Sequence, residues 1–210
     1  MQMGGVMGGI YTVCDWIWKI ALVNLLWILF TLTGIIVFGV MPATVALFTV
    51  VRKWNMKEAD TPVSQVFFQT YKKEFLHANI VGLIMGAIGF FLFIDYRLVM
   101  AIGGTVQYIL LIPLLILLGL YLITLLYLFP VYVHFELKFL QYFKYAFYIG
   151  TLNIHITILM VAALLLLSFP LSFFPGFIPF FSVSLMSIVM MFGAIIAFKR
   201  IEKKQKKFSA

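Results

Sequence analysis

The sequence predicts an all-α protein: a polytopic transmembrane helix bundle of about five spans, with interfacial amphipathic helices on its cytoplasmic side. Hydrophobic residues make up 64% of the 210 residues and charged residues only 10%, and the mean hydropathy is +1.12. Soluble domains are nearer half apolar and a quarter charged, so a soluble globular enzyme and a disordered chain are both excluded. The apolar residues fall into runs long enough for a bilayer crossing, which takes about 20 helical residues. We therefore expect residues 1–210 to form a single integral membrane domain.

The first span is expected at about residues 20–40, and it ends or kinks at Pro42 because proline cannot continue a helix interior. The apolar residues 43–51 are too few for another crossing, which favours a short membrane-dipping helix. A six-span alternative, in which residues 20–51 divide at Gly34, stays open.

The rest of the chain alternates between interfacial stretches and further spans. Aromatic residues every third or fourth position before residue 78 predict an amphipathic helix in the interface, and residues 134–148 form a second aromatic and basic stretch. Residues 199–210 form a basic tail that we expect to be cytoplasmic. The four remaining spans are expected at about 79–97, 106–133, 152–169 and 180–198.

The basic residues predict how these spans are threaded. If the segments between successive spans are assigned alternately to the two sides of the membrane, all of the 15 Lys and Arg except Lys19 and Arg97 fall on one side. Cytoplasmic loops are enriched in Lys and Arg, so this side is expected to face the cytoplasm, with the N-terminus outside and the C-terminus inside. The formal charge of +8 then indicates anionic lipid headgroups as partners, and no nucleic acid.

A set of residues between positions 24 and 54 points to a known family, and further matches lie on either side of it. The set comprises Asn24, Trp27, Gly34, Gly39, Pro42-Ala43-Thr44 and Arg52-Lys53-Trp54, with Gly9, Tyr11, Trp16, Tyr71-Lys72-Lys73-Glu74-Phe75, Asn79 and Gly82 outside it. In these residues the chain resembles the YesL-like family of bacterial integral membrane proteins of unknown function. The resemblance implies a bacterial plasma-membrane protein encoded beside sugar importers, carbohydrate-sensing two-component systems and polysaccharide-degrading enzymes. It implies no reaction.

No motif in the sequence predicts an enzyme. A phosphate-binding loop, a dinucleotide fingerprint and a GxSxG nucleophile elbow are all missing from the sequence. His77, His134 and His155 lack the i,i+4 spacing of a zinc motif, and Cys14, the single cysteine, excludes a disulfide or a Cys-based zinc site. We therefore expect no catalytic residue, no metal and no cofactor.

Four positions are candidates for helix contacts or a polar path. The amide of Asn24 lies inside the first span and must find a partner, either across helices or along a polar path. Pro42 marks a broken-helix element, which in transporters lines a substrate path. Gly82 and Gly86 form a small-xxx-small pair, which indicates close helix packing within the chain or in a homo-oligomer.

The Arg52-Lys53-Trp54 triplet combines two cations with an indole at the expected cytoplasmic boundary. Such a triplet is either a membrane-interface anchor or a docking surface for a cytoplasmic partner or an anionic lipid.

With the resemblance, these features favour a non-enzymatic accessory or regulatory component of carbohydrate uptake. Its partners would be subunits of a sugar importer or a sensor kinase. Two alternatives stay open: a stand-alone small-solute transporter or channel, and a lipid-organising structural membrane protein.

Overall fold

A computed structural model describes residues 6–56, 58 and 61–208, and within them every regular element is helical. The all-α prediction is confirmed. The elements are α1 (Val6–Thr33), α2 (Val40–Asn55), α3 (Val63–Ile102), α4 (Gly104–His134), α5 (Phe139–Leu152), α6 (Ile154–Phe173), the 3₁₀ turn η1 (Pro175–Phe177) and α7 (Ile178–Phe208).

Five segments are long and apolar enough to cross a membrane, which agrees with the expected number of spans. They are Gly8–Thr33, Val63–Ile102, Gly104–His134, Ile154–Phe173 and Pro175–Lys203. The two remaining helices, α2 and α5, have 16 and 14 residues. At 1.5 Å per residue they are about 24 and 21 Å long, too short for the roughly 30 Å hydrocarbon core. The chain is therefore a membrane-embedded helical protein with two short helices between its spans.

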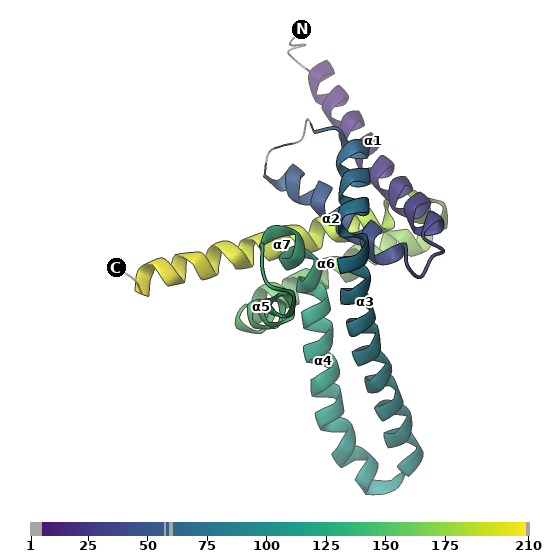
Figure 1. Cartoon of the computed structure of the whole chain (residues 1–210), viewed down its shortest axis with the longest axis vertical. Helices are drawn as coiled ribbons and strands as arrows, with labels where there is room; N and C mark the ends of the chain where they lie inside the picture. Colours follow the sequence, from purple (N-terminus) through teal and green to yellow (C-terminus); the bar gives the residue numbers. More distant parts are fainter. Residues whose placement is uncertain (1–5, 57, 59–60, 209–210) are drawn as a thin grey trace.

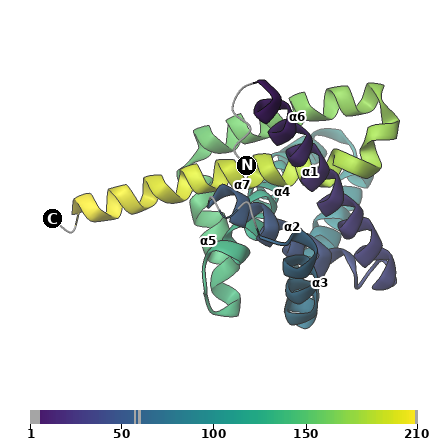
Figure 2. The same ribbon diagram turned by 90° about the horizontal axis from the view of Figure 1, so that it is seen from above.

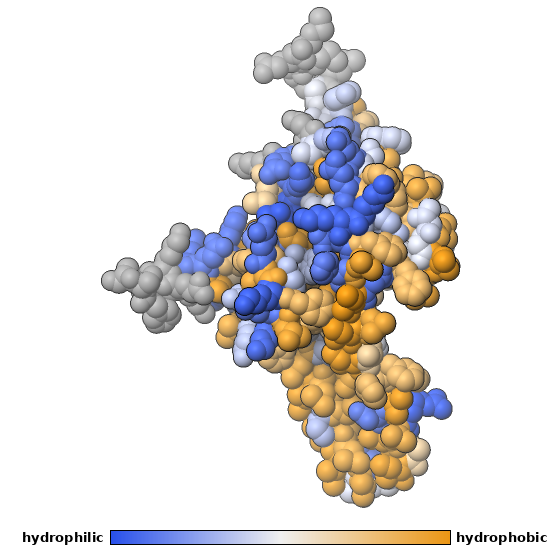
Figure 3. Space-filling view, viewed as in Figure 1, coloured by the Kyte–Doolittle hydropathy of each residue, from blue (hydrophilic) through white to orange (hydrophobic). Residues whose placement is uncertain are grey.

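The helices cross around a centre from which one hairpin projects. Figure 1 shows α3 and α4 as an antiparallel pair whose connected ends lie far from the other helices. In the view from above, α6 and α7 run beside each other, and α7 crosses the direction of the hairpin (Figure 2). In Figure 3 the projecting hairpin is covered mainly by hydrophobic residues, and hydrophilic residues gather where the helices cross.

The short helix α2 lies at this crossing and forms the centre of the protein. It packs against α1, α3, α4 and α7. Ala43, Ala46, Leu47 and Val51 are completely inaccessible to solvent. Residues 43–51 thus belong to a short helix enclosed by protein, which favours the short-helix alternative over the six-span one.

The boundaries of the first span differ from those expected. The helix begins at Val6 and ends at Thr33, whereas we expected a span at 20–40. It extends toward the N-terminus because Asp15 and Lys19 are one helical turn apart and form an ion pair of 2.7 Å, so their charges do not end the helix. It ends before Pro42 because the chain turns at residues 34–39, where Ile35 and Ile36 have φ angles of 57° and 60°.

The aromatic stretch before residue 78 is not a separate helix, because α3 continues through Asn79 to Ile102. Between residues 63 and 79 the sequence has no proline or glycine to break the helix. Two of its aromatic side chains, Phe67 and Tyr71, are buried, and the Phe67 ring lies 5.4 Å from that of Phe30 in α1, whereas Phe68 is exposed. The second aromatic stretch does form a separate amphipathic helix, α5, with Ala146 and Ile149 buried and Leu140, Tyr145 and Tyr148 exposed.

Candidate functional site

The turn between α1 and α2 is held by close backbone packing. A Cβ on Gly34 would meet the backbone of Gly39, and a Cβ on Gly39 would meet the Thr31 carbonyl oxygen. Tyr71 of α3 donates a hydrogen bond of 3.0 Å from its hydroxyl to the Phe30 carbonyl oxygen at the end of α1. Three residues that support the family resemblance, Gly34, Gly39 and Tyr71, therefore have a structural role at one turn.

Asn79 and Gly82 of α3 contact the same region. The Asn79 amide donates to the Phe38 carbonyl oxygen at 2.9 Å, which ties the turn to α3. A Cβ on Gly82 would meet the side chain of Met41 in α2. A Cβ on Gly86 would meet no atom within 4 Å. Of the predicted pair, therefore, Gly82 packs closely within the chain and Gly86 does not.

Asn24 is fully buried and connects α1 to the start of α7. Its amide nitrogen donates to the Pro179 carbonyl oxygen at 2.6 Å, and its amide oxygen accepts from the Ser184 backbone N–H at 2.9 Å. Both polar ends of the amide are thus used in contacts with one neighbouring helix.

Pro42 lies in the first turn of α2 and is buried. At this position its missing N–H removes no intrahelical hydrogen bond, so the proline starts the helix and does not kink it.

The Arg52-Lys53-Trp54 triplet does not form one surface. Trp54 is only 7% exposed and packs edge-on against Trp16 of α1, with ring centroids 5.5 Å apart. Lys53 forms an ion pair with Glu58 at 3.7 Å. Arg52 lines a polar cavity. Three successive residues of a helix point about 100° apart, which explains why they have three environments.

The cavity is the main polar site of the described residues. It has a volume of about 370 Å³ and lies between α2, α3, the end of α4 and the turn that follows α4. Its polar and aromatic lining includes Arg52, Thr49, Thr70, Lys73, Glu74, Tyr132, His134, Phe135, Glu136 and Tyr142.

Three of these side chains, Glu74, Tyr132 and Lys73, interact with one another in the cavity wall. The Tyr132 hydroxyl donates to Glu74 Oε2 at 2.7 Å, and Lys73 Nζ lies 3.9 Å from Glu74 Oε1. By contrast, Arg52 Nε and His134 Nδ1 are buried and have no hydrogen-bond partner in the described part of the chain. The His134 ring packs between Phe135 and Phe198, with centroids 4.8 Å from each.

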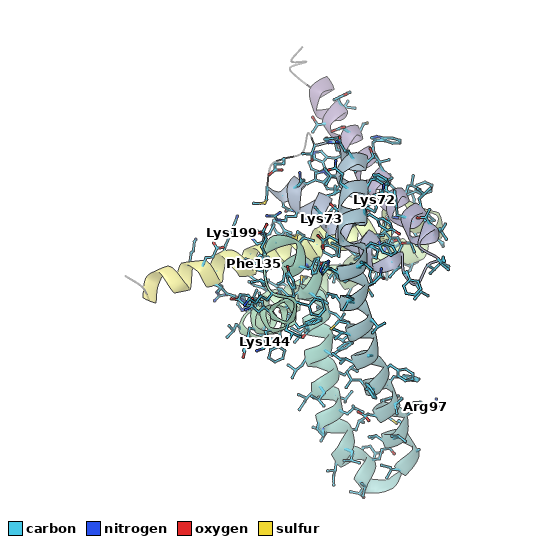
Figure 4. All side chains as sticks on the ribbon, in the orientation of Figure 1. Lys72, Lys73, Arg97, Phe135, Lys144 and Lys199 are labelled. Atoms are coloured by element: carbon cyan, nitrogen blue, oxygen red, sulfur yellow. The ribbon has the colours of Figure 1, made fainter. Side chains whose placement is uncertain are left out.

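Several basic side chains lie in the part of the molecule where the helices cross. Figure 4 labels Lys72, Lys73, Lys144 and Lys199 there, and of these four Lys73 lines the cavity. Arg97 lies apart from them, near the far end of the α3–α4 hairpin (Figure 4).

The cavity lining offers side chains that can bind a ligand. Of these, the sequence analysis identified only Arg52 as a candidate site residue. Arg52 was a candidate, whereas Tyr132 and Tyr142 were not. No local motif signals this cavity, because its residues come from separate segments that meet only after folding. Within the described residues, no group of three His, Cys, Asp or Glu side chains could hold a metal ion.

Comparisons with known proteins identify relatives along the whole chain. Residues 20–96 match a family described as "Protein of unknown function, DUF624". The chain is 39% identical to the uncharacterized protein YteU of Bacillus subtilis (strain 168), over 91% of this chain and 86% of that protein. It is 35% identical to the uncharacterized protein YesL of the same organism, over 100% and 99%, and 36% identical to the uncharacterized protein YesV, over 94% and 95%. No solved structure was found to match it.

Proposed function

The chain belongs to the YesL-like DUF624 family of proteins of unknown function, and from this premise we propose that it is a non-enzymatic accessory or regulatory component of carbohydrate uptake. It acts in the bacterial plasma membrane, with its basic side toward the cytoplasm. The observation that supports this best is the polar cavity, whose lining includes the cations Arg52 and Lys73. A concave polar site with these charged groups is suited to contact with a cytoplasmic component.

The outer surface of two helices that contribute to the cavity lining, α3 and α5, also carries exposed aromatic groups. On α5, Tyr145 and Tyr148 are 45% and 58% exposed, and Lys144 lies between them in sequence. On α3, Lys72 Nζ lies 4.4 Å from the centre of the Phe68 ring. Tyrosine and other aromatic residues are enriched in protein interfaces, so this surface supports docking of an importer subunit or a sensor kinase.

Affinity purification tests the proposed partner. Tagged protein is isolated from native membranes in a mild detergent, and the co-purified proteins are quantified by mass spectrometry. We expect near-stoichiometric recovery of a sugar-importer permease or a sensor kinase. Lys144→Glu should reduce that recovery several-fold, because it reverses charge on the docking surface. Arg97→Glu is the matched control at the far end of the hairpin and should leave it unchanged.

Three other results would contradict the proposal. Recovery of the protein alone, followed by solute flux in liposomes, would indicate a stand-alone transporter or channel. Recovery with anionic lipid but no protein partner would indicate a lipid-organising structural role. Unchanged oligosaccharide uptake and induction after deletion of the gene would also contradict the accessory role.

Cysteine labelling tests the proposed orientation. Cys14→Ser supplies the background, and single cysteines are introduced at the exposed positions Glu58, before α3, and Thr105, at the start of α4. An impermeant maleimide added to intact cells should label Thr105→Cys, whereas Glu58→Cys should react only after permeabilisation. Labelling of both positions from one side would show that the threading is wrong.

A further inference from the structure

Arg52 is a charged group without a partner in a partly enclosed site. Its side chain is half-buried and lines the cavity, and among the described residues it makes no hydrogen bond and no ion pair. Removing a charge from water is costly unless the charge is paired. A guanidinium presents a planar fork of donors that matches the oxygens of a phosphate or a carboxylate. Among the described residues, no carboxylate forms an ion pair with the Arg52 guanidinium, so this group is available to bind an anion.

The other charged groups of the cavity restrict what kind of anion can enter. Glu74 is held by Tyr132 and lies near Lys73, and Glu136 is exposed on the turn after α4. With Arg52 and Lys73, these carboxylates give a lining whose formal charges cancel. A bare anion would face two carboxylates, whereas an anion that also carries hydroxyl groups could donate hydrogen bonds to them.

The size of the cavity sets a limit on the ligand. A volume of about 370 Å³ lies at the lower end of the range for small-molecule sites. We propose that this cavity binds a phosphate ester of a polyhydroxyl compound, with the phosphate on Arg52 and the hydroxyl groups on Glu74 and Glu136. Thr70 and Tyr142, which also line the cavity, supply further hydroxyl groups beside such a ligand.

Two sources offer this chemistry. One is the headgroup of phosphatidylglycerol, in which a phosphate is joined to a glycerol with free hydroxyls. The other is a free phosphorylated polyol, for which glycerol 3-phosphate is the smallest suitable probe. Lys73, the lysine of the cavity lining, attracts either, since basic residues near a membrane surface concentrate anions.

The test uses the purified full-length protein. Calorimetric titration measures the affinity for glycerol 3-phosphate, with inorganic phosphate and glycerol as comparison ligands. Native mass spectrometry counts the lipids retained after incubation with vesicles of phosphatidylglycerol or of phosphatidylcholine. We expect Arg52→Gln to weaken glycerol 3-phosphate binding, or phosphatidylglycerol retention, by about tenfold or more, because a charge-assisted bond is lost.

Lys53→Gln is the matched control. Lys53 is the next residue and carries the same charge, but it pairs with Glu58 and does not line the cavity, so its replacement should change neither measurement. Arg52→Lys should retain part of the affinity, since it keeps the charge and loses the fork. Glu136→Ala, at an exposed position on the turn after α4, should lower the preference for glycerol 3-phosphate over inorganic phosphate.

The outcomes separate the two sources. Saturable glycerol 3-phosphate binding that depends on Arg52 supports a free phosphorylated polyol. Selective phosphatidylglycerol retention that depends on Arg52 supports a lipid headgroup. If the wild-type protein binds neither, or if Arg52→Gln and Lys53→Gln behave alike, the proposal is overturned. None of these measurements involves an importer or a kinase, so failure here leaves the proposed accessory role untouched.

Discussion

Gly39→Ala is expected to lower the free energy of unfolding by about 3 kcal/mol or more, because overpacking against rigid groups cannot be relieved by rotating a side chain. A Cβ at this position would meet the Thr31 carbonyl oxygen and would lie 2.8 Å from the Phe30 carbonyl oxygen. Both acceptors belong to the last turns of α1. The substitution would therefore push α1 away from α2, the helix at the centre of the core. The melting temperature of the detergent-solubilised protein measures this effect.

Two other glycines provide graded controls. Gly82→Ala should lower the free energy of unfolding by less, about 1 kcal/mol, because its new Cβ meets the flexible side chain of Met41. Gly86→Ala should be neutral or stabilising by up to about 1 kcal/mol, since alanine is the better helix former and the site is open. If Gly86→Ala were as harmful as Gly39→Ala, a surface outside this chain would be packed against Gly86. A second copy of the protein would then be the first partner to test.

The number of spans could be predicted from the sequence, but their ends could not. Hydropathy reports which segments can lie in hydrocarbon, because a spanning helix must satisfy its backbone internally. It does not report where a helix continues beyond the bilayer. The first span was expected to begin at about residue 20, yet α1 starts at Val6, and Asp15 and Lys19 form an ion pair within one turn of it. At the other end, the turn depends on Gly34 and Gly39, whose close approach becomes visible only in three dimensions.

The candidate site could be predicted only in part. Arg52 was singled out, but with Lys53 and Trp54 as one membrane-interface anchor or docking surface, because sequence adjacency does not show the direction of side chains on a helix. Trp54 is buried in the core and Lys53 pairs with Glu58. The other residues that line the cavity with Arg52 lie mainly at positions 70–74 and 132–142, and only tertiary packing brings them together. Gly34, Gly39 and Tyr71 were identified from the sequence as residues that match the family. Their role in holding the α1–α2 turn becomes visible only in the structure.

Asn24→Leu is expected to lower the free energy of unfolding by about 1–3 kcal/mol. The change keeps the approximate size of the side chain but removes both hydrogen bonds to α7, at 2.6 Å to Pro179 and 2.9 Å to Ser184. Hydrogen bonds between membrane helices average about 0.6 kcal/mol and reach about 1.7 kcal/mol. Here the Ser184 N–H would also lose its side-chain partner in a fully buried position. Thermal unfolding in detergent, monitored as the loss of the monodisperse gel-filtration peak, measures this loss of stability.

Asn55→Leu is the matched control, because Asn55 is exposed and its amide bonds only to the Val51 carbonyl oxygen of its own helix at 3.0 Å. The same chemical change should therefore have little effect there. A polar path through Asn24 makes a different prediction: the variant would keep its stability and lose a transport activity. Equal melting temperatures for Asn24→Leu and the wild type would contradict the helix-contact role, whereas a selective loss at Asn24 would show that its amide serves to join α1 to α7.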